Sequence, residues 1–265
     1  MNEDASPPPP PQEPCTLEEC LRNRGYAAPR PLRSDGNAPV YRADDRDGSG
    51  RSVVLKLVRS AADFAAERRR HERLRGAAGI VALLDAFVAR GHGGVIVTPL
   101  CAGGDLLDFV SARGAPLGAA EAAALLHTAG AAVAAAHGRG TVLGDLKPEN
   151  ICVLEPQHGI ARGNVAVIDV GTALNVTAAY QPRGAGGGLP RHSEANDVFA
   201  LGKSVANLLL FKLDSCADDV ASLAALPAPA RELLCAMLRE GPGAQPRPSI
   251  AEVLAHPWVV AAGGG

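Results

Sequence analysis

The chain has 265 residues, of which 47% are hydrophobic and 20% are charged, and its formal net charge at pH 7 is −2. This is enough apolar material for one large domain or two lobes, and the charge gives no electrostatic reason to expect a nucleic acid or a membrane as the main partner. The six cysteines form neither CxxC pairs nor a zinc-type pattern, which indicates reduced thiols in an intracellular protein, cytoplasmic or nuclear.

The N-terminal segment, MNEDASPPPPPQEP, is acidic and proline-rich and lacks the apolar run of a secretory signal. Its five consecutive prolines favour an extended, disordered chain. A partner of the SH3 type would need a nearby arginine, so a plain tail is the preferred interpretation. We therefore expect a disordered tail over residues 1–25, a folded domain over residues 26–258 and a flexible glycine tail over residues 259–265.

The first part of the folded domain has the pattern of a small β-rich lobe with one helix. Residues 40–43 and 53–58 are β-rich runs that flank a turn-forming stretch, which predicts a hairpin. Residues 61–75 have a helical composition, and four of their side chains fall on one face: Phe64, Glu67, His71 and Leu74. Two further strand-like runs complete this lobe: residues 80–88 and 94–98.

From residue 105 onward the pattern is mostly helical, with short β regions around residues 141–154 and 164–168. The longest apolar stretch, residues 119–136, is mostly alanine and is interrupted by Glu121 and His127. We therefore expect an internal helix there rather than a membrane span.

Two charged residues of the first lobe are candidates for a phosphate-binding pair. Phosphoryl transfer needs a cation on the nucleotide phosphates, oxygen ligands for a metal ion and a carboxylate near the attacking hydroxyl. Lys56 lies in the strand VVLKLV, and Glu67 follows eleven residues later on the apolar face of the helix, where it can pair with that lysine. Glu72 lies roughly 140° further round the helix and is the poorer candidate. The arginines at 68–70 are interpreted as a solvated face.

The second lobe supplies the remaining groups. The run DLKPEN holds an acid, a base and an amide at fixed spacing: Asp145, Lys147 and Asn150. Asp169 follows nineteen residues after Asn150, in the run VIDVG. Between the lobes, VTPLCAGGDL at residues 97–106 is typical of an extended linker.

In this order, VVLKLV, DLKPEN and VIDVG resemble the motifs of eukaryotic-type serine/threonine protein kinases. Three later runs resemble the same family: TAAYQPR from residue 177, DVFALG from residue 197, and RPS to HPW over residues 247–258. The resemblance implies an α+β, two-lobed protein kinase fold. Its N-lobe, β-rich with one helix, would span about residues 26–98, its hinge residues 99–104 and its larger, mainly helical C-lobe residues 105–258.

The resemblance also implies ATP and Mg²⁺ as cofactors and gives roles to residues. Lys56 and Glu67 would position the phosphates, Asp145 would accept the proton of the substrate hydroxyl, and Lys147 would neutralise the γ-phosphate. Metal ligands would be Asn150 and Asp169, and Thr177 would shape the floor for the acceptor. The nucleotide-binding set comprises Lys56, Val40, Val54, Thr98, Leu100, Cys101 and Cys152.

Some departures from the family pattern concern the nucleotide and regulation. The phosphate-covering loop, aligned over residues 32–40, has none of the three expected glycines, and Arg33 and Asp35 occupy two of these positions, which predicts weaker nucleotide binding. Leu143 and Val170 replace a histidine and a phenylalanine in mutual contact, and an apolar pair should still pack. Gly144 replaces the arginine that receives an activation-loop phosphate, so we expect no regulation by that route.

Other departures concern the substrate side. Arg183 stands where the family has a glutamate that pairs with the arginine matched by Arg247. Two buried like charges cost several kcal/mol unless they separate or find carboxylates, so we expect a rearranged helix junction, with Glu194 and Asp197 as nearby candidate carboxylates. The segment over residues 212–227 is short for the usual substrate-lobe helix.

Two functional hypotheses follow. In the first, the chain is a serine/threonine protein kinase that transfers the γ-phosphoryl group of ATP to protein hydroxyls. In the alternative, it is a pseudokinase that acts as a nucleotide-binding or scaffold module. The partners implied are protein substrates and any protein that the proline-rich tail meets, with no nucleic acid and no membrane, and a monomer is expected.

Overall fold

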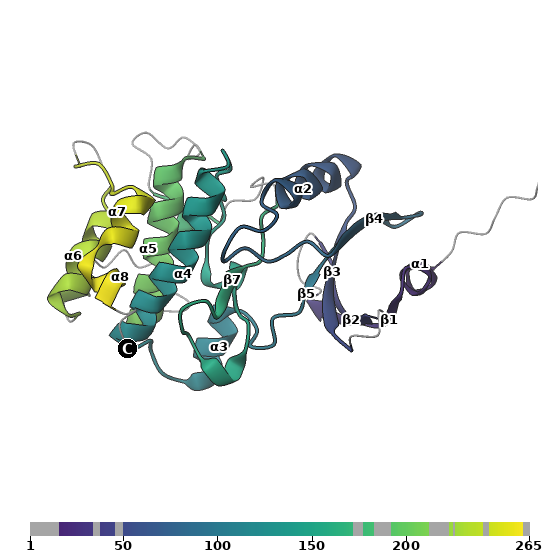
Figure 1. Ribbon diagram of the computed structural model, residues 1–265, viewed down its shortest axis with the longest axis horizontal. Coiled ribbons are helices and arrows are strands. Elements are labelled where there is room, and N and C mark those ends of the chain that lie inside the picture. Colours follow the sequence, from purple (N-terminus) through teal and green to yellow (C-terminus); the bar gives the residue numbers. More distant parts are fainter. Residues whose placement is uncertain are drawn as a thin grey trace, which may run out of the picture.

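The computed structural model describes residues 16–33, 38–45, 50–171, 177–182, 192–211, 223–224, 226–240 and 244–261. These residues form two lobes that lie side by side (Figure 1). One lobe holds a β-sheet with the helices α1 and α2, and the other is mainly helical. The expected α+β, two-lobed architecture is confirmed.

The N-lobe sheet is antiparallel, with the strand order β1-β2-β3-β5-β4. Its strands are β1 (Tyr26–Arg33), β2 (Val40–Asp45), β3 (Ser52–Val58), β4 (Asp85–Ala89) and β5 (Gly93–Pro99). The predicted hairpin is confirmed, because β2 and β3 pair directly, with Val40 opposite Lys56. The strand predicted over residues 80–88 is wrong in its first half: β4 begins at Asp85, and Ile80 instead bridges to Val167 of the other lobe.

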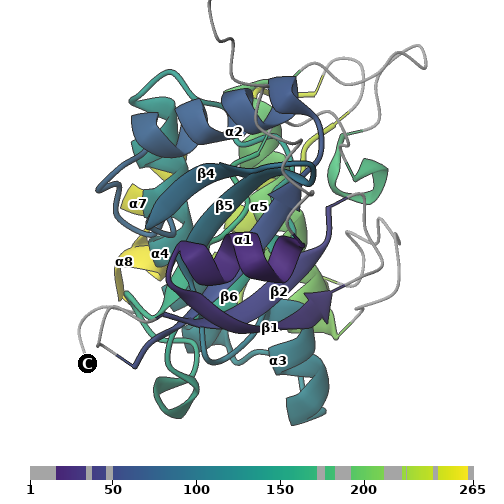
Figure 2. The same ribbon diagram turned by 90° about the vertical axis from the view of Figure 1, so that its right-hand side faces the viewer.

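The two faces of the sheet have different partners because strand side chains alternate. On the outer face, α1 (Leu17–Asn23) lies across the strands (Figure 2) and contributes Leu21 to the buried cluster. The strands add Tyr26, Ala43, Val53, Leu55, Leu57, Phe87, Ala89, Val95 and Val97. The inner face carries the residues of alternate register, including Lys56, and it borders the cavity described below.

Helix α1 corrects the predicted tail boundary at residue 25. Thr16 and Glu19 form a capping box at its start, and Leu21 is only 1% exposed, so the chain is anchored from residue 16 onward. Residues 1–15 lie outside the described part of the chain. The expectation of six reduced thiols also needs correction, because Cys20 in α1 is disulfide-bonded, whereas Cys101, Cys152 and Cys235 are outside any disulfide.

Helix α2 (Ala61–Arg73) confirms the predicted helix and packs on β5 and β3. Ser60 caps its first turn, since its side chain accepts a hydrogen bond from the Asp63 N–H. Phe64, Glu67 and His71 are its buried residues. Phe64 lies so close to Gly94 of β5 that a Cβ there would be only 2.1 Å from the Phe64 ring. Glycine at position 94 thus lets the helix approach the sheet.

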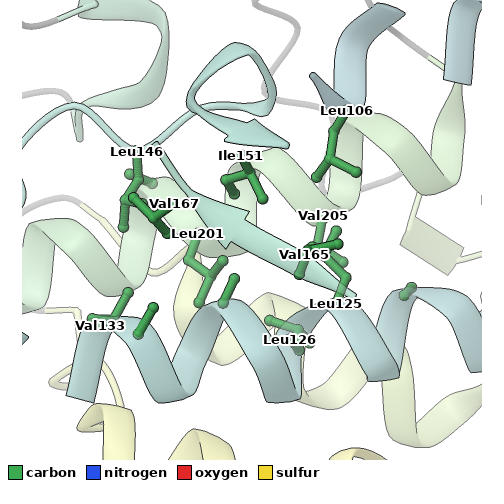
Figure 3. Packing of buried hydrophobic residues seen from close by; sticks show 14 of the residues in the cluster. Leu106, Leu125, Leu126, Val133, Leu146, Ile151, Val165, Val167, Leu201 and Val205 are labelled. Carbon is green, nitrogen blue, oxygen red and sulfur yellow. The ribbon is translucent and has the colours of Figure 1, made fainter. Parts of the chain in front are cut away.

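The C-lobe is built around α4 (Ala119–His137), which contacts α5, α7, α8 and β7. The surrounding elements are α3 (Leu106–Arg113), α5 (Glu194–Leu210), α6 (Ala228–Met237), α7 (Ile250–Ala255), α8 (Pro257–Ala261), β6 (Ile151–Val153) and β7 (Val165–Val167). Figure 3 shows Leu125 and Leu126 of α4, Leu201 and Val205 of α5, and Val165 of β7 pointing toward one another.

Two predictions about the C-lobe have clear outcomes. By length and composition α4 could cross a membrane, but 61% of its most apolar window is buried inside the protein, which confirms the internal helix. The glycine tail begins later than residue 259, because α8 continues to Ala261 and Val259 is fully buried.

Candidate active site

A cavity of about 890 Å³ lies between the inner face of the sheet and the C-lobe. Its lining includes every residue that the sequence analysis placed in the catalytic, nucleotide-binding and metal sets. These are Val40, Val54, Lys56, Glu67, Thr98, Leu100, Cys101, Asp145, Lys147, Asn150, Cys152 and Asp169. Residues up to 129 positions apart in the sequence, from Val40 to Asp169, therefore meet in one place.

Lys56 connects the N-lobe to the C-lobe at this cavity. Its Nζ donates to Glu67 Oε1 at 2.9 Å and to both carboxylate oxygens of Asp169 at 3.2 Å. Glu67 is therefore the partner predicted from the helix period, while Glu72 pairs with Arg68 on the exposed side of α2. The register explains the position of the lysine, because Val40 and Ile96 lie opposite Lys56 on the neighbouring strands and face the same cavity.

The electrostatics of this cluster favour a charged lysine. Burial by itself lowers the pKa of Lys56, but Asp169 and Glu67 outweigh it, so the pKa of Lys56 is raised. For Asp169, burial works in the opposite sense to Lys56 and the Gly171 N–H, which together hold its pKa below the usual value. Burial raises the pKa of Glu67, and the attraction of Lys56 opposes this only in part. At neutral pH the lysine thus stays a cation, available to a phosphate.

The run DLKPEN forms the opposite wall of the cavity. Lys147 Nζ lies 2.9 Å from Asp145 Oδ2 and donates to Thr177 Oγ1 at 2.7 Å. The Thr177 N–H donates to Asp145 Oδ1 at 3.0 Å, and Asn150 Nδ2 donates to the Asp145 carbonyl at 2.8 Å. The predicted acid, base and amide are therefore linked to one another and to Thr177.

Apolar neighbours fix this loop in place. Leu146 is 1% exposed and Ile151 is fully buried, and both side chains belong to the C-lobe core (Figure 3). Because they alternate with Asp145, Lys147 and Asn150, burying one set turns the polar set toward the cavity. Leu143 and Val170 are also buried in the same core cluster, in agreement with the expected apolar replacement.

Asp197 supports the site, a role that the sequence analysis did not give it. It is 1% exposed, and its carboxylate accepts hydrogen bonds from the Leu143 N–H at 2.8 Å and the Gly144 N–H at 2.7 Å. His137 Nε2 lies 2.8 Å from the same carboxylate. Gln181 donates to the Gly144 carbonyl at 3.0 Å. Residues 143–144 are thus held by side chains on both sides.

Neither Asp197 nor Glu194, the candidates for compensating Arg183 and Arg247, contacts Arg247 among the described residues, and Arg183 lies outside them. Arg247 donates to the carbonyls of Arg239 at 2.8 Å and Ala195 at 3.2 Å, and to Asn196 Oδ1 at 3.3 Å. Its guanidinium also lies 4.9 Å from the centre of the Phe199 ring. Within the described residues, carbonyls, an amide and an aromatic face therefore contact this arginine, and the nearby charge of Glu240 opposes the lowering of its pKa by burial.

Arg70 corrects the prediction of a solvated arginine face. Its Nε donates to the Val170 carbonyl and its Nη2 to the Val142 carbonyl, both at 2.6 Å. Arg68 and Arg69 are exposed as expected. The helical period carries the signal that was missed, because a residue three positions after Glu67 lies close to it on the helix surface.

Two thiols border the linker between the lobes. Cys101 and Cys152 are 8% and 7% exposed, and a hydrogen bond from Cys152 holds the pKa of the Cys101 thiol below its usual value. The linker is fixed to β6 by the N–H groups of Ala102 and Gly103, which donate to the carbonyls of Leu154 and Val153. A cavity wall of thiols and aliphatic side chains suits a flat, apolar group such as a nucleobase.

Several departures noted in the sequence lie outside the described residues. They are the side chain of Arg33, residues 34–37 with Asp35, Arg183, and residues 212–222.

Comparison with known proteins agrees with this geometry. The family model for the protein kinase domain matches residues 36–259. The chain is 30% identical over 226 residues to the serine/threonine-protein kinase PknL of Mycobacterium tuberculosis, covering 78% of this chain and 55% of that protein. It is 30% identical over 211 residues to the serine/threonine-protein kinase pim-2 of Danio rerio, covering 70% of this chain and 63% of that protein. The chain thus spans little more than half the length of these curated relatives.

Among solved structures, the crystal structure of Rad53 residues 1–466 in complex with AMP-PNP is similar, with a TM-score of 0.70 at 22% identity. The match covers 91% of this chain and 68% of that chain. At this identity the likeness shows the shared fold.

Proposed function

Since this chain belongs to the protein kinase family, we propose that it is an ATP-dependent serine/threonine protein kinase. One observation carries the proposal. Lys56 Nζ lies 2.9 Å from Glu67 and 3.2 Å from Asp169, in the same cavity that Asp145, Lys147 and Asn150 line. Every type of group that phosphoryl transfer requires is therefore in contact with one solvent-open cavity.

The residues divide the work by position. Val40, Val54 and Cys152 would enclose the adenine beside the linker, and Lys56, held by Glu67, would bind the phosphates. Asp145 would orient the acceptor hydroxyl and take its proton. Lys147 would stabilise the charge that develops on the transferred group. Its hydrogen bond to Thr177 joins this lysine to the segment where the acceptor would lie.

The donor set fits Mg²⁺. Asp169 offers a carboxylate and Asn150 an amide oxygen, both lining the cavity, and these are ligand types that Mg²⁺ prefers. Both Asp169 oxygens already accept hydrogen bonds from a cation, the Lys56 ammonium. Bound there, Mg²⁺ would neutralise charge on the phosphate oxygens.

Protein hydroxyls of serine and threonine are the proposed acceptors. This choice rests on the DLKPEN lysine and its contact with Thr177, and on the printed names of the two curated relatives. The proposal further includes a monomeric protein inside the cell, cytoplasmic or nuclear, whose proline-rich segment is a plain tail, with a partner for that segment as the alternative. Light scattering after size-exclusion chromatography tests the oligomeric state.

Binding and chemistry are best tested separately. We expect Mg-ATP to raise the melting temperature of the wild-type protein and of Asp145→Asn, because this carboxylate acts on the hydroxyl rather than on the nucleotide. Transfer of radiolabelled phosphate to a generic basic protein should fall roughly 10²–10⁴-fold in Asp145→Asn. Lys56→Met should lose both binding and transfer.

The pseudokinase alternative becomes an outcome of this test. A wild-type protein that binds Mg-ATP but transfers no more phosphate than Asp145→Asn would be a nucleotide-binding module. A protein with no Mg-dependent stabilisation would overturn the proposal altogether. The features that motivated this alternative are the Arg33 side chain, Asp35, Arg183 and the short segment over residues 212–222. They lie outside the described residues, so no observation favours the alternative.

A further inference from the structure

The side chain of Arg70 leaves the N-lobe and contacts both loops that carry the polar groups of the site. One acceptor, the Val170 carbonyl, belongs to the residue directly after Asp169. The other, the Val142 carbonyl, lies three residues before Asp145. Both distances are 2.6 Å, so one guanidinium fixes the spacing between the two loops and α2. Glu67 lies one turn earlier on this helix, and its position therefore depends on where Arg70 holds the helix.

Arginine is well suited to this task. Its planar guanidinium presents donors in a fixed fork, so two carbonyls can be held at a defined separation, and it stays charged in proteins. The side chain is half-buried, and burial lowers the pKa of Arg70, while the charges of Asp197, Asp169 and Glu67 act in the opposite direction. The hydrogen bonds are charge-assisted and hence stronger than those between neutral groups.

The segment that Arg70 holds is also held from the other side. Asp197 accepts hydrogen bonds from the N–H groups of Leu143 and Gly144, directly after the carbonyl that Arg70 binds. Gly144 itself has a φ of 82°, a conformation that glycine adopts without strain. It has no side chain with which to receive a phosphate, so this loop is fixed by groups from α2 and α5 instead.

We propose that Arg70 is the positioning residue that keeps α2, the Asp169 turn and the catalytic loop assembled without a phosphate on the segment after Asp169. This inference rests on the proposed kinase function and names the regulation of the same site. In this arrangement Arg70 and the Lys56–Glu67 pair act on the same helix, one turn apart, and both connect it to the C-lobe loops through hydrogen bonds. The two hydrogen bonds from Arg70 to the Val142 and Val170 carbonyls, called the link below, therefore take the place of a phosphorylation switch.

Hydrogen exchange of the nucleotide-free, full-length protein tests the link without requiring activity. In Arg70→Met, which loses both donors, we expect the amides of residues 65–73, 142–144 and 169–171 to exchange roughly tenfold faster or more, because two charge-assisted hydrogen bonds are removed. Arg70→Lys keeps the charge and one donor, so it should restore part of the protection. Arg69→Met is the matched control, since Arg69 is exposed on the same helix, and it should exchange like the wild type.

Kinetics provide the second readout. If the wild-type protein transfers phosphate, Arg70→Met should raise the KM for Mg-ATP severalfold and lower kcat about tenfold or more, since both Lys56 and Asp145 lose alignment. Arg70→Lys should recover part of kcat, and Arg69→Met should match the wild type.

The two proposals fail in different ways. Faster exchange in Arg70→Met together with an inactive wild-type protein would support the link and overturn the kinase function. Wild-type exchange in Arg70→Met, or equally fast exchange in Arg69→Met, would overturn the link even if the protein is an active kinase. If Arg70→Met does not fold, unchanged protection and kcat in Arg70→Lys relative to wild type would likewise overturn the need for a two-donor fork.

Discussion

His71 shows how one buried residue ties the stability of the N-lobe to pH. It lies one turn after Glu67 on α2, is 3% exposed, and its Nδ1 has no hydrogen-bond partner among the described residues. Burial lowers its pKa from 6.5 to about 4, with Lys56 and Arg70 acting in the same direction and Asp169 against them. The unfolded chain therefore binds a proton that the folded protein excludes between these pH values, so stability falls as the pH drops.

For the nucleotide-free protein in magnesium-free buffer, we expect His71 to account for a loss of up to about 3 kcal/mol of unfolding free energy between pH 6.5 and pH 4. Urea unfolding at several pH values measures this. In His71→Leu the decline over this window should be shallower by that amount. Equal slopes in wild type and His71→Leu would contradict the assignment.

Single residues also show what sequence reasoning can reach. Lys56, Glu67, Asp145 and Asp169 could be assigned to one site because their motifs resemble those of protein kinases, and the strand and helix periods place Lys56 and Glu67 on the appropriate faces. Arg70 was missed because an arginine in a run of three normally faces solvent. The helical period places it near Glu67, but its partners depend on the position of the C-lobe loops. The same holds for Asp197, whose partners are backbone N–H groups that sequence does not specify.

At the level of elements, α1 makes the outer face of the sheet a buried interface. Leu21 is the one buried residue of this short helix, at 1% exposure, and it belongs to the same cluster as Phe87 and Val97. We expect Leu21→Ala to lower the free energy of unfolding by about 2–4 kcal/mol, because it opens a cavity beneath the helix. Thermal and urea unfolding measure the change.

The control for this prediction is Arg22→Ala on the exposed side of α1, which should change stability little because its pair with Glu18 is solvent-exposed. Mg-ATP should still bind the folded Leu21→Ala protein and raise its melting temperature, since the nucleotide cavity lies on the opposite face of the sheet. Loss of nucleotide binding in the folded Leu21→Ala protein would show that α1 also supports the site.

Helices and strands were predictable where the hydrophobic period was strong. They were not predictable where contacts with distant parts of the chain determine the backbone conformation. The β2–β3 hairpin and α2 carry clear alternation or helical patterns and are confirmed. β1 contains Pro29 and Pro31 and has register shifts on each side of Arg30 and Pro31, so only its place at the edge of the sheet permits it. The strand expected from residue 80 is replaced by contacts to Val167, a partner far away in sequence.

In the whole molecule, the C-terminal end of α2 and the chain after it belong mechanically to the C-lobe. Arg139 donates to the carbonyls of Arg73 and Arg75, at 3.1 Å and 2.9 Å. The Val167 N–H donates to the Gly79 carbonyl at 2.8 Å, and Val167 accepts from the Val81 N–H at 2.9 Å. With Arg70 these contacts hold α2 near the catalytic loop. When the lobes close on a nucleotide, we therefore expect mainly the sheet to move, with residues 79–81 and the linker between the lobes as the hinge.

This attachment leads to a prediction for the intact protein: phosphatase treatment should change its rate of phosphate transfer by less than about twofold. A switch based on phosphorylation moves a helix between two positions, and here α2 is already held in one, while Gly144 offers no cation to a phosphate. Mass spectrometry before and after treatment confirms removal of phosphate, and the Asp145→Asn variant reports any phosphate added by the expression host. A tenfold or larger rise in the rate on phosphorylation of the segment between Asp169 and Thr177 would contradict this prediction. It would show that α2 also adopts an inactive position, from which phosphorylation moves it.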